Sequence, residues 1–364
     1  MANKKDYICA VPFSSIEQME HRSYLCCASW LKKYLPMNVK IDEAWNSDDA
    51  NDIRDSILDG SYRYCDSQQC PMLHQLETFG DLGGSSQRTD VGKIAPLFHK
   101  NNLPDGLQKT INDYKNGLPI TPSIIQFSFD RTCNLECPSC RVKLFTADKK
   151  KIKEVEATIA DIELKYGETV QSLYITGSGD PFISVGFRNF LRKFDKSKWP
   201  ELKSIHLHTN ATKWNKKMWD SMKNIHPYVF SCEISIDACT KDTYETKTRL
   251  GGNWDDLMDN LKFIETIPKL VKIKPSFVVQ QSNYKEIKLF YDTMIGIFGK
   301  KANVFFGKIT NWGTFSKKEF EKENIWNESH PEHSQFLIEL NKTLPARQAW
   351  SNLQEFIKPQ NSII

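Results

Sequence analysis

The stretch SIIQFSFDRTCNLECPSC, residues 123–140, joins a strand-like apolar run to three closely spaced cysteines, Cys133, Cys137 and Cys140. Their spacing is C-x3-C-x2-C, and the next cysteine in the chain is the distant Cys232. Thiolates are the usual ligands of zinc and of iron–sulfur clusters, and a structural zinc site normally has a fourth protein ligand. The array therefore indicates a metal or cluster centre with one open position, which is typical of a catalytic centre.

Apolar strand patterns and helical patterns alternate from residue 121 onward. Strands are expected at residues 123–130, 172–179, 204–211, 229–237, 273–281 and 303–310, and helices at residues 149–166, 186–194, 214–224, 254–267 and 284–298. This alternation predicts an α/β fold with a parallel sheet. The cysteine array and the segments GSGDP, HTNA and SIDA all follow a strand, which favours a partial TIM-like (β/α)6 barrel over a doubly wound sheet.

The chain is expected to have four parts. Residues 1–80 lack the alternation and hold five of the ten cysteines, which predicts a small irregular N-terminal domain. Glycine, proline and polar residues predict a connector at residues 81–120. The barrel is expected at residues 121–350, with a C-terminal tail at residues 351–364.

Composition limits the partners and the compartment. The 49 basic and 45 acidic side chains nearly cancel, at a net charge of +4, so nucleic acid is not an expected partner. The sequence has no signal-peptide pattern and no apolar run of the ~20 residues that a membrane span needs, so the chain is expected in the cytoplasm. The cytosol keeps thiols reduced, so the clustered cysteines indicate metal or redox chemistry.

The array and several later segments together resemble the signature of the radical S-adenosylmethionine (AdoMet) enzymes. These segments are TGSGDPF at residues 176–182, HTNA at 208–211, SIDA at 235–238 and SFVVQQSN at 276–283. In that superfamily, three cysteines hold a 4Fe–4S cluster and AdoMet chelates the fourth iron. The resemblance thus implies reductive cleavage of AdoMet to a 5′-deoxyadenosyl radical, which abstracts hydrogen from the substrate. It also implies a one-electron reductant such as flavodoxin or ferredoxin.

The resemblance extends to cofactor contacts. It implies that the Gly-rich segment binds the AdoMet amino group, that Ser235 and Arg249 contact the ribose and the carboxylate, and that the fifth strand packs the adenine. Small residues allow close backbone approach, and arginine offers fork-shaped donors. The implied AdoMet contacts are Gly177, Ser178, Gly179, Asp180, Asn210, Ser235, Arg249 and Val279.

Residues 1–80 resemble the SPASM or shorter twitch segments, which carry an auxiliary 4Fe–4S cluster and normally follow the barrel. The implied ligands of this second cluster are Cys9, Cys26, Cys65 and Cys70. Cys27 is the alternative to Cys26, and a zinc ion held by four thiolates is the alternative occupant. Cys232 and Cys239 are expected to be buried, inert thiols.

The mechanism that the resemblance implies is a net two-electron oxidation of a small polar metabolite or carbohydrate, with the auxiliary cluster accepting an electron. Peptide maturation and epimerisation are alternatives, the latter with Cys27 or Cys239 as hydrogen-atom donor. A zinc-stabilised, non-catalytic binding protein is the alternative from another class, and RNA modification is disfavoured by the charge balance. Asp237 is the catalytic candidate, with His208 and Lys308 as other bases. Further candidates for the barrel wall are Gln126, Gln280 and Trp312.

Overall fold

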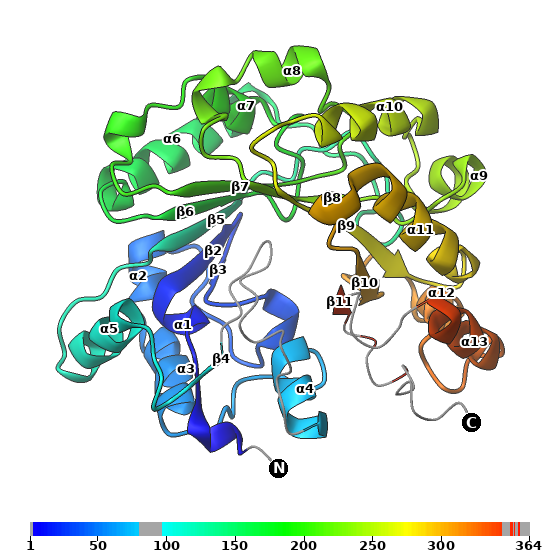
Figure 1. Cartoon of the computed structure of the whole chain (residues 1–364). Coiled ribbons are helices and arrows are strands. Elements are labelled where there is room, and N and C mark those ends of the chain that lie inside the picture. The colour runs from blue at the N-terminus through cyan, green and yellow to red at the C-terminus, as the bar shows by residue number, and fades with distance from the viewer. Residues whose placement is uncertain (1–2, 80–96, 344–349, 352, 354–355, 357–364) are drawn as a thin grey trace.

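A curved nine-stranded sheet forms the centre of the computed structural model, which describes residues 3–79, 97–343, 350–351, 353 and 356 (Figure 1). Its strands, in spatial order, are β11 (Trp350–Ser351), β10 (Phe305–Lys308), β9 (Lys272–Val279), β8 (Ser231–Ser235), β7 (Ser204–Thr209), β6 (Ser172–Ile175), β5 (Ile124–Ser128), β2 (Ser15–Met19) and β3 (Ser23–Tyr24). The six strands expected from the sequence are β5 to β10, and all six are confirmed.

The strands β5 to β10 are parallel, and their spatial order follows their order in the chain. A doubly wound sheet reverses its strand order at a switch point, and this part of the sheet has no such reversal. The predicted α/β class and the resemblance to a partial TIM-like barrel are therefore confirmed. The carboxyl ends of these strands meet at one edge, where the loops can form a common site.

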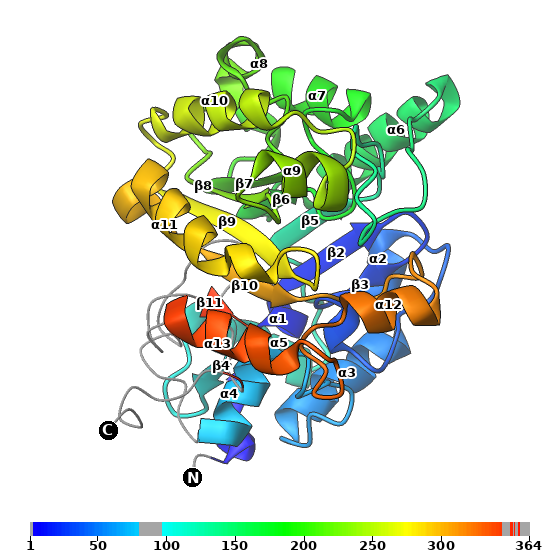
Figure 2. The ribbon, with the colours of Figure 1, turned by 90° about the vertical axis from the view of Figure 1, so that its right-hand side faces the viewer.

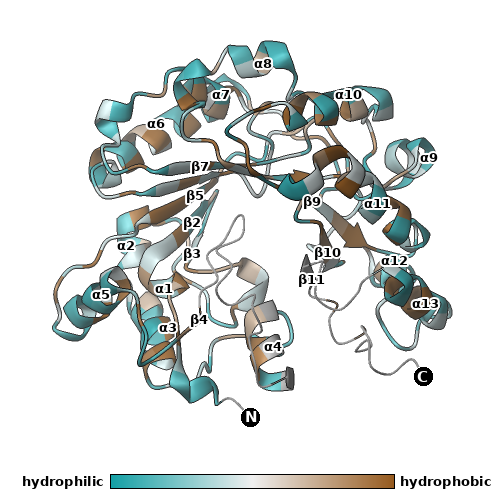
Figure 3. Ribbon diagram, in the orientation of Figure 1, coloured by the Kyte–Doolittle hydropathy of each residue, from teal (hydrophilic) through white to brown (hydrophobic). Residues whose placement is uncertain are grey.

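The helices that follow these strands cover the convex side of the sheet. They are α6 (Lys149–Tyr166), α7 (Val185–Arg192), α8 (Lys216–Asp220), α9 (Lys241–Thr243), α10 (Trp254–Glu265) and α11 (Ile287–Phe298), with a π-helical turn at Tyr244–Thr248. In α6, Val155, Ile159 and Ile162 are buried at helical spacing, and the Asp148 side chain caps the helix by accepting from the Lys151 N–H. Figure 3 shows the resulting division, with polar residues facing outward on these helices.

The remaining helices lie near the two ends of the sheet, those of the N-terminal segment near β2 and β3 and the last two near α11 (Figures 1 and 2). They are α1 (Val11–Ser14), α2 (Ile41–Trp45), α3 (Asp48–Leu58), α4 (Pro71–Phe79), α5 (Asp105–Lys115), α12 (Lys317–Glu323) and α13 (His333–Thr343). Short 3-10 turns occur at Lys4–Asp6, Ala28–Trp30, Lys196–Lys198, Lys223–Ile225, Tyr284–Glu286 and Gly299–Lys301. In the described part of the chain, no helix is long and apolar enough to cross a bilayer.

The N-terminal segment contributes directly to the barrel sheet, which the sequence did not predict. The strand β2 pairs in parallel with β5, from Ser15 opposite Ile124 to Met19 opposite Ser128, and β3 pairs antiparallel with β2. The sheet therefore crosses the boundary that the sequence predicts at residue 80. The reason for the miss is that SIEQM has only two apolar side chains, Ile16 and Met19, and so lacks the β-rich run of a core strand.

The described part of the expected connector is also folded. The strand β4 (Leu97–His99) pairs antiparallel with β1 (Tyr7–Cys9), and α5 buries Ile111. The Trp45 indole N–H donates to the Ile120 carbonyl at 2.8 Å, which fixes the end of this segment to the N-terminal region. Residues 97–120 thus belong structurally with the N-terminal segment. Residues 81–96, and all of the expected tail except Ser351, Leu353 and Phe356, lie outside the described residues.

Candidate functional site

The three cysteines of the array lie on the loop between β5 and α6, at the carboxyl edge of the sheet. Cys133 and Cys137 are buried, whereas Cys140 is exposed. The Cys140 N–H donates to the Cys137 carbonyl at 2.9 Å, and the Glu136 N–H donates to the Leu250 carbonyl at 2.9 Å. The loop is therefore shaped by its own backbone and attached to the segment that follows β8.

Each of the three sulfur atoms faces a nitrogen donor. The pairs are Asn210 Nδ2 and Cys133 Sγ at 3.5 Å, Arg249 Nη1 and Cys137 Sγ at 3.4 Å, and Arg141 Nη2 and Cys140 Sγ at 3.5 Å. Two of these donors carry a full positive charge, which stabilises negative charge on the sulfur atoms and so opposes the effect of burial on the thiols.

The thiols of the array also influence one another. Burial raises the pKa of Cys133 to about 11, and the neighbouring Cys137 adds to this effect. Burial likewise raises the pKa of Cys137, where Arg249 acts in the opposite direction and Cys140 raises the pKa further. Three thiols on one loop, of which Cys137 interacts with both others and none with a fourth cysteine in these effects, fit a cluster with one open position. Metal binding here must release protons.

The Gly-rich segment packs directly against the start of the cysteine loop. A Cβ on Gly179 would lie 2.2 Å from the Asp130 carbonyl oxygen, and one on Gly177 would lie 2.5 Å from Gln126 Nε2. The Asp180 N–H donates to the Thr132 carbonyl at 2.9 Å. Backbone atoms cannot move aside as a side chain can, so only glycine allows the approach at residue 179, whereas Gly177 faces the end of the Gln126 side chain.

Asp180 joins the Gly-rich segment to the end of β7. Its Oδ2 accepts from Thr209 Oγ1 at 2.7 Å and from the Asn210 N–H at 2.8 Å, and its Oδ1 accepts from the Phe182 N–H at 2.9 Å. Burial raises the pKa of Asp180, and these hydrogen bonds oppose the rise. Both carboxylate oxygens are thus engaged within the protein, which makes Asp180 an organiser of the site.

Asp237 lies beside the array in an ion pair with Arg249. Its Oδ2 is 2.6 Å from Arg249 Nη2, and its Oδ1 accepts from the Val278 N–H at 2.7 Å. Burial raises the pKa of Asp237, against the charge of Arg249. The backbone of Asp237 has a φ of 56°, a left-handed conformation that is costly for a non-glycine residue and occurs mostly where the surroundings enforce it. Asp237 therefore orients Arg249, and its predicted role as a base is not tested by this geometry.

Ser235 and Val279 have surroundings different from the other implied AdoMet contacts. Ser235 Oγ lies 2.9 Å from His208 Nε2, on the face of the sheet rather than on the cysteine loop. The Val279 side chain is fully buried, so only its backbone could reach a ligand. The neighbouring Gln280 and Pro138 both line a cavity of about 580 Å3 next to the cysteine loop.

Two further candidates from the sequence lie apart from the array. Lys308 Nζ stands 5.2 Å from the centre of the Trp326 ring, in a cation–π arrangement. The Trp312 side chain is 57% exposed. Lys308 is the last residue of β10, and Trp312 lies in the segment that follows it.

A row of charged and polar side chains crosses β7, β8 and β9, and the sequence analysis missed most of it. Lys274 Nζ is 2.9 Å from Glu233 Oε2, and His208 Nε2 is 4.0 Å from Glu233 Oε1. Burial alone would raise the pKa of Glu233, but Lys274 and His208 lower it to about 2. The sequence pattern that could have revealed this row is the alternation in HLHT, CEIS and KIKP, where every second residue of a core strand is polar.

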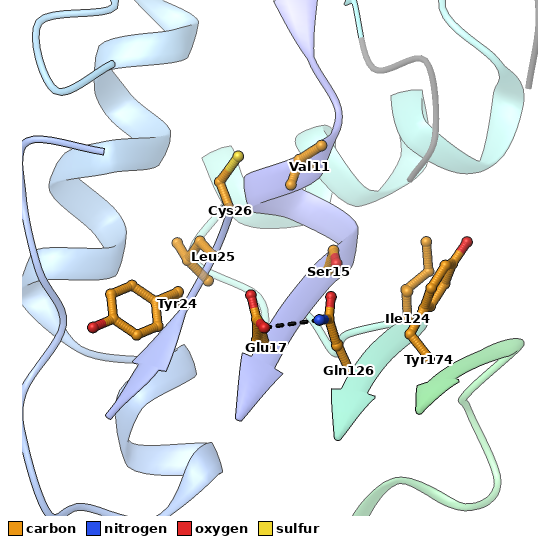
Figure 4. A pocket seen from close by; sticks show the side chains of 9 residues that line it. All are labelled: Val11, Ser15, Glu17, Tyr24, Leu25, Cys26, Ile124, Gln126 and Tyr174. Carbon is orange, nitrogen blue, oxygen red and sulfur yellow. Dashed lines mark hydrogen bonds between the residues drawn. The ribbon is translucent and has the colours of Figure 1, made fainter. Parts of the chain in front are cut away.

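A second polar group lies on β2 and β5. Glu17 Oε1 accepts from Gln126 Nε2 at 2.7 Å and from Ser128 Oγ at 2.8 Å. Figure 4 shows Glu17 and Gln126 in the wall of a small cavity that Cys26 and Tyr174 also line. The sequence analysis missed Glu17 because it did not predict β2.

The N-terminal cysteines form a second group of thiols. Burial, together with the neighbouring thiols of Cys65 and Cys70, raises the pKa of Cys9. Burial raises the pKa of Cys70 to about 11, and the charge of Cys27 adds to it. Cys27 thus lies near Cys70, and Cys26 lines the small cavity of Figure 4, so the choice of Cys26 rather than Cys27 as a ligand stays a prediction.

The remaining two cysteines, Cys232 and Cys239, are buried, as expected. Among the described residues, no group of three or more His, Cys, Asp or Glu side chains is arranged around a single ion position.

Comparison with known proteins gives distant structural neighbours. No family model matches the sequence, and no curated protein matches it. SuiB from Streptococcus suis, bound to its precursor peptide SuiA, has 17% identity and a TM-score of 0.45 over 76% of this chain and 60% of SuiB. The structure of anSMEcpe with bound AdoMet has 15% identity and a TM-score of 0.42 over 60% of this chain and 58% of the other. BtrN with AdoMet and 2-DOIA has 12% identity and a TM-score of 0.23 over 44% of this chain and 67% of BtrN.

These neighbours are radical AdoMet enzymes, the class that the cysteine array predicts. The chain spans about 60% of the length of SuiB. At such identities and TM-scores, no residue is carried over from them, and the assignment of the site depends on the geometry of this chain.

The close approach at Gly179 yields a first prediction. Gly179→Ala places a Cβ against the Asp130 carbonyl and is expected to lower the free energy of unfolding by about 1–3 kcal/mol. Gly106→Ala is the matched control, because nothing lies within 4 Å of its added Cβ. Urea denaturation of both variants measures the difference. Equal stability of the two variants would contradict the packing described here.

The ion pair of Glu233 yields a second prediction. The pKa of Glu233 falls from an ordinary 4.5 to about 2 in the folded protein, so its contribution to stability is present above about pH 4.5 and is lost toward pH 2. Lys274→Met removes the nearest positive charge from this buried carboxylate and is expected to cost about 3–5 kcal/mol near neutral pH. The loss should shrink in acid, where Glu233 is protonated.

The measurement is the urea unfolding free energy of the wild type and Lys274→Met as the pH is lowered. Lys269→Met, at an exposed position, is the matched control and should follow the wild type. A difference between Lys274→Met and the wild type that does not change with pH would refute the electrostatic origin of the effect.

Proposed function

We propose that this chain is a radical AdoMet enzyme in which Cys133, Cys137 and Cys140 hold a 4Fe–4S cluster. The observation that carries the proposal is the array itself: three thiols on one loop, each facing a nitrogen donor. The Gly-rich segment packed against this loop supports AdoMet as the ligand of the open position. When both groups are bound, the cluster supplies the electron for reductive cleavage of AdoMet, and the resulting radical abstracts hydrogen from the substrate.

The residues of this chain would bind and orient the cofactor. The backbone of Gly177, Ser178 and Gly179 offers the close approach that the AdoMet amino group needs. The cavity of about 580 Å3 beside Pro138 and Gln280 supports an adenine position near the end of β9. Asn210 and Arg249 already contact the array, and Asp180 fixes the loops between them.

The polar concave face supports a small polar metabolite or a carbohydrate as the substrate. TIM-barrel interiors are usually filled with Val, Ile and Leu, whereas this face carries Glu17, Gln126, His208, Glu233 and Lys274. Such side chains match hydroxyl and amino groups by hydrogen bonding, and an apolar substrate would leave them without partners. A peptide is the alternative within this class, in view of the precursor peptide bound to SuiB.

The N-terminal thiols support a second cluster, held by Cys9, Cys27, Cys65 and Cys70. Four thiolates from the protein would leave no open iron, which suits transfer of an electron from the substrate radical and a net two-electron oxidation. An oxidation also needs a base; His208, beside Glu233, is half-buried on the concave face, whereas both oxygens of Asp237 are engaged. The electron donor would be a flavodoxin or ferredoxin in the cytoplasm, approaching the exposed Cys140.

Iron analysis tests the proposal. The chain is purified anaerobically and reconstituted, and iron and sulfide are counted in the wild type and in a variant with Cys133→Ala, Cys137→Ala and Cys140→Ala. About eight irons are expected in the wild type and about four in the variant. With dithionite and AdoMet, only the wild type should form 5′-deoxyadenosine. A colourless, zinc-containing wild type would refute the proposal and favour a non-catalytic binding protein.

Single variants test the second group of thiols. Cys27→Ser is expected to reduce the iron content by about four atoms, and Cys26→Ser, its matched control, is expected to keep about eight. The opposite result would return the ligand role to Cys26. Full iron in both variants would contradict a cluster held by four N-terminal cysteines.

A further inference from the structure

The donors around the cysteine array come from three separate segments of the chain. Asn210 follows β7, Arg249 follows the π-helical turn after β8, and Arg141 directly follows the last cysteine of the array. The N···S distances of 3.4–3.5 Å are those of hydrogen bonds to sulfur. Each sulfur has one such donor, and the fold brings two of the three, Asn210 and Arg249, from distant parts of the sequence.

Arg249 is held rigidly in this position. Its Nη2 pairs with Asp237 Oδ2 at 2.6 Å, its Nε donates to the Ile236 carbonyl at 3.4 Å, and its Nη1 is then directed at Cys137 Sγ. The side chain of Arg249 is only 11% exposed. With the guanidinium fixed through two other contacts, its orientation toward Cys137 does not depend on a ligand.

Arg141 and Asn210 are fixed in the same manner. Arg141 Nη1 donates to the Arg131 carbonyl at 2.9 Å, and its Nη2 donates to the Ser178 carbonyl at 3.1 Å. Asn210 Oδ1 accepts from the Thr212 N–H at 2.9 Å, which leaves the Nδ2 of the amide on the side of the array. All three donors are therefore oriented before any group binds.

We propose that Arg249, Arg141 and Asn210 set the reduction potential of the barrel cluster by donating hydrogen bonds to its cysteine sulfurs, and that Asp237 is the positioning residue for Arg249. The proposal rests on the proposed function, because it requires the cluster. One-electron reduction by a flavodoxin or ferredoxin adds negative charge to the cluster, part of which resides on the cysteine sulfurs. Donors and positive charges near these atoms stabilise the reduced form and raise its potential.

The burial and charge of each donor–sulfur pair determine how strongly that pair shifts the reduction potential. Arg249 and Cys137 are both buried, so their interaction is weakly screened, whereas Cys140 is exposed and its interaction with Arg141 is screened by water. Asn210 is neutral and contributes a hydrogen bond without a charge. The expected order of influence is therefore Arg249, then Arg141, then Asn210.

The experiment is a redox titration of the reconstituted holoenzyme, followed by electron paramagnetic resonance in the absence of AdoMet. The signal of the barrel cluster is identified as the one that changes when AdoMet is added and that is missing from the triple cysteine variant. Arg249→Met is expected to shift its midpoint to a more negative potential, and Arg141→Met to shift it less in the same direction. Arg188→Met is the matched control, since Arg188 donates to the Phe182 carbonyl and should leave the midpoint unchanged.

The outcomes separate this inference from the proposed function. No iron–sulfur signal in the wild type would end the proposed function itself. If Arg249→Met keeps its full iron content and the midpoint potential of its barrel cluster is unchanged, the inference is overturned. This holds even if the variant binds AdoMet more weakly. If Arg249→Met does not assemble a cluster, the midpoints of Arg249→Lys and Arg141→Met test the inference instead. A more negative midpoint in both variants supports the inference. An unchanged midpoint in either variant overturns it.

Discussion

The buried carboxylate of Asp180 is the interaction on which the rest of the site depends. It accepts hydrogen bonds from Thr209 and Asn210 at the end of β7 while its own N–H donates to Thr132 ahead of the cysteines. The loops after β5, β6 and β7 are thereby joined at one point. A buried charge without these donors would cost several kcal/mol, roughly the effective penalty of desolvating one ion, so the three loops are stable only together. The position of Asn210 beside Cys133 is a direct consequence.

The second constraint is the register of the parallel strands. His208 lies opposite Glu233, and Glu233 lies opposite Lys274, so alternate residues of three strands form one row on the concave face. In the same way, Glu17 lies opposite Gln126 on β2 and β5. A shift of one residue in any pair would move these charges to the side that the helices cover. The polar character of the face and the pairing of the strands therefore support each other.

The sequence was sufficient for the parts that follow strong local patterns, and insufficient where tertiary contacts decide. The strands β5 to β10 and α6 were predictable because apolar periodicity determines them. The strand β2 was not predictable, because SIEQM forms a strand by pairing with β5 rather than through its own composition. The contacts of Asp237 were not predictable for a related reason: sequence position indicates a strand end, but not that Arg249 and the Val278 N–H engage both oxygens.

The pairing of β2 also determines where Cys9 and Cys27 lie relative to the array. Cys9 ends β1 shortly before β2 begins, and Cys27 follows β3, which runs antiparallel to β2. Both cysteines therefore lie toward the amino end of β2. Cys133, in contrast, follows the carboxyl end of β5, with which β2 pairs in parallel. Cys9 and Cys27 thus lie toward one end of these paired strands and the array toward the other, so an electron that passes between them has to cross the length of β2 and β5.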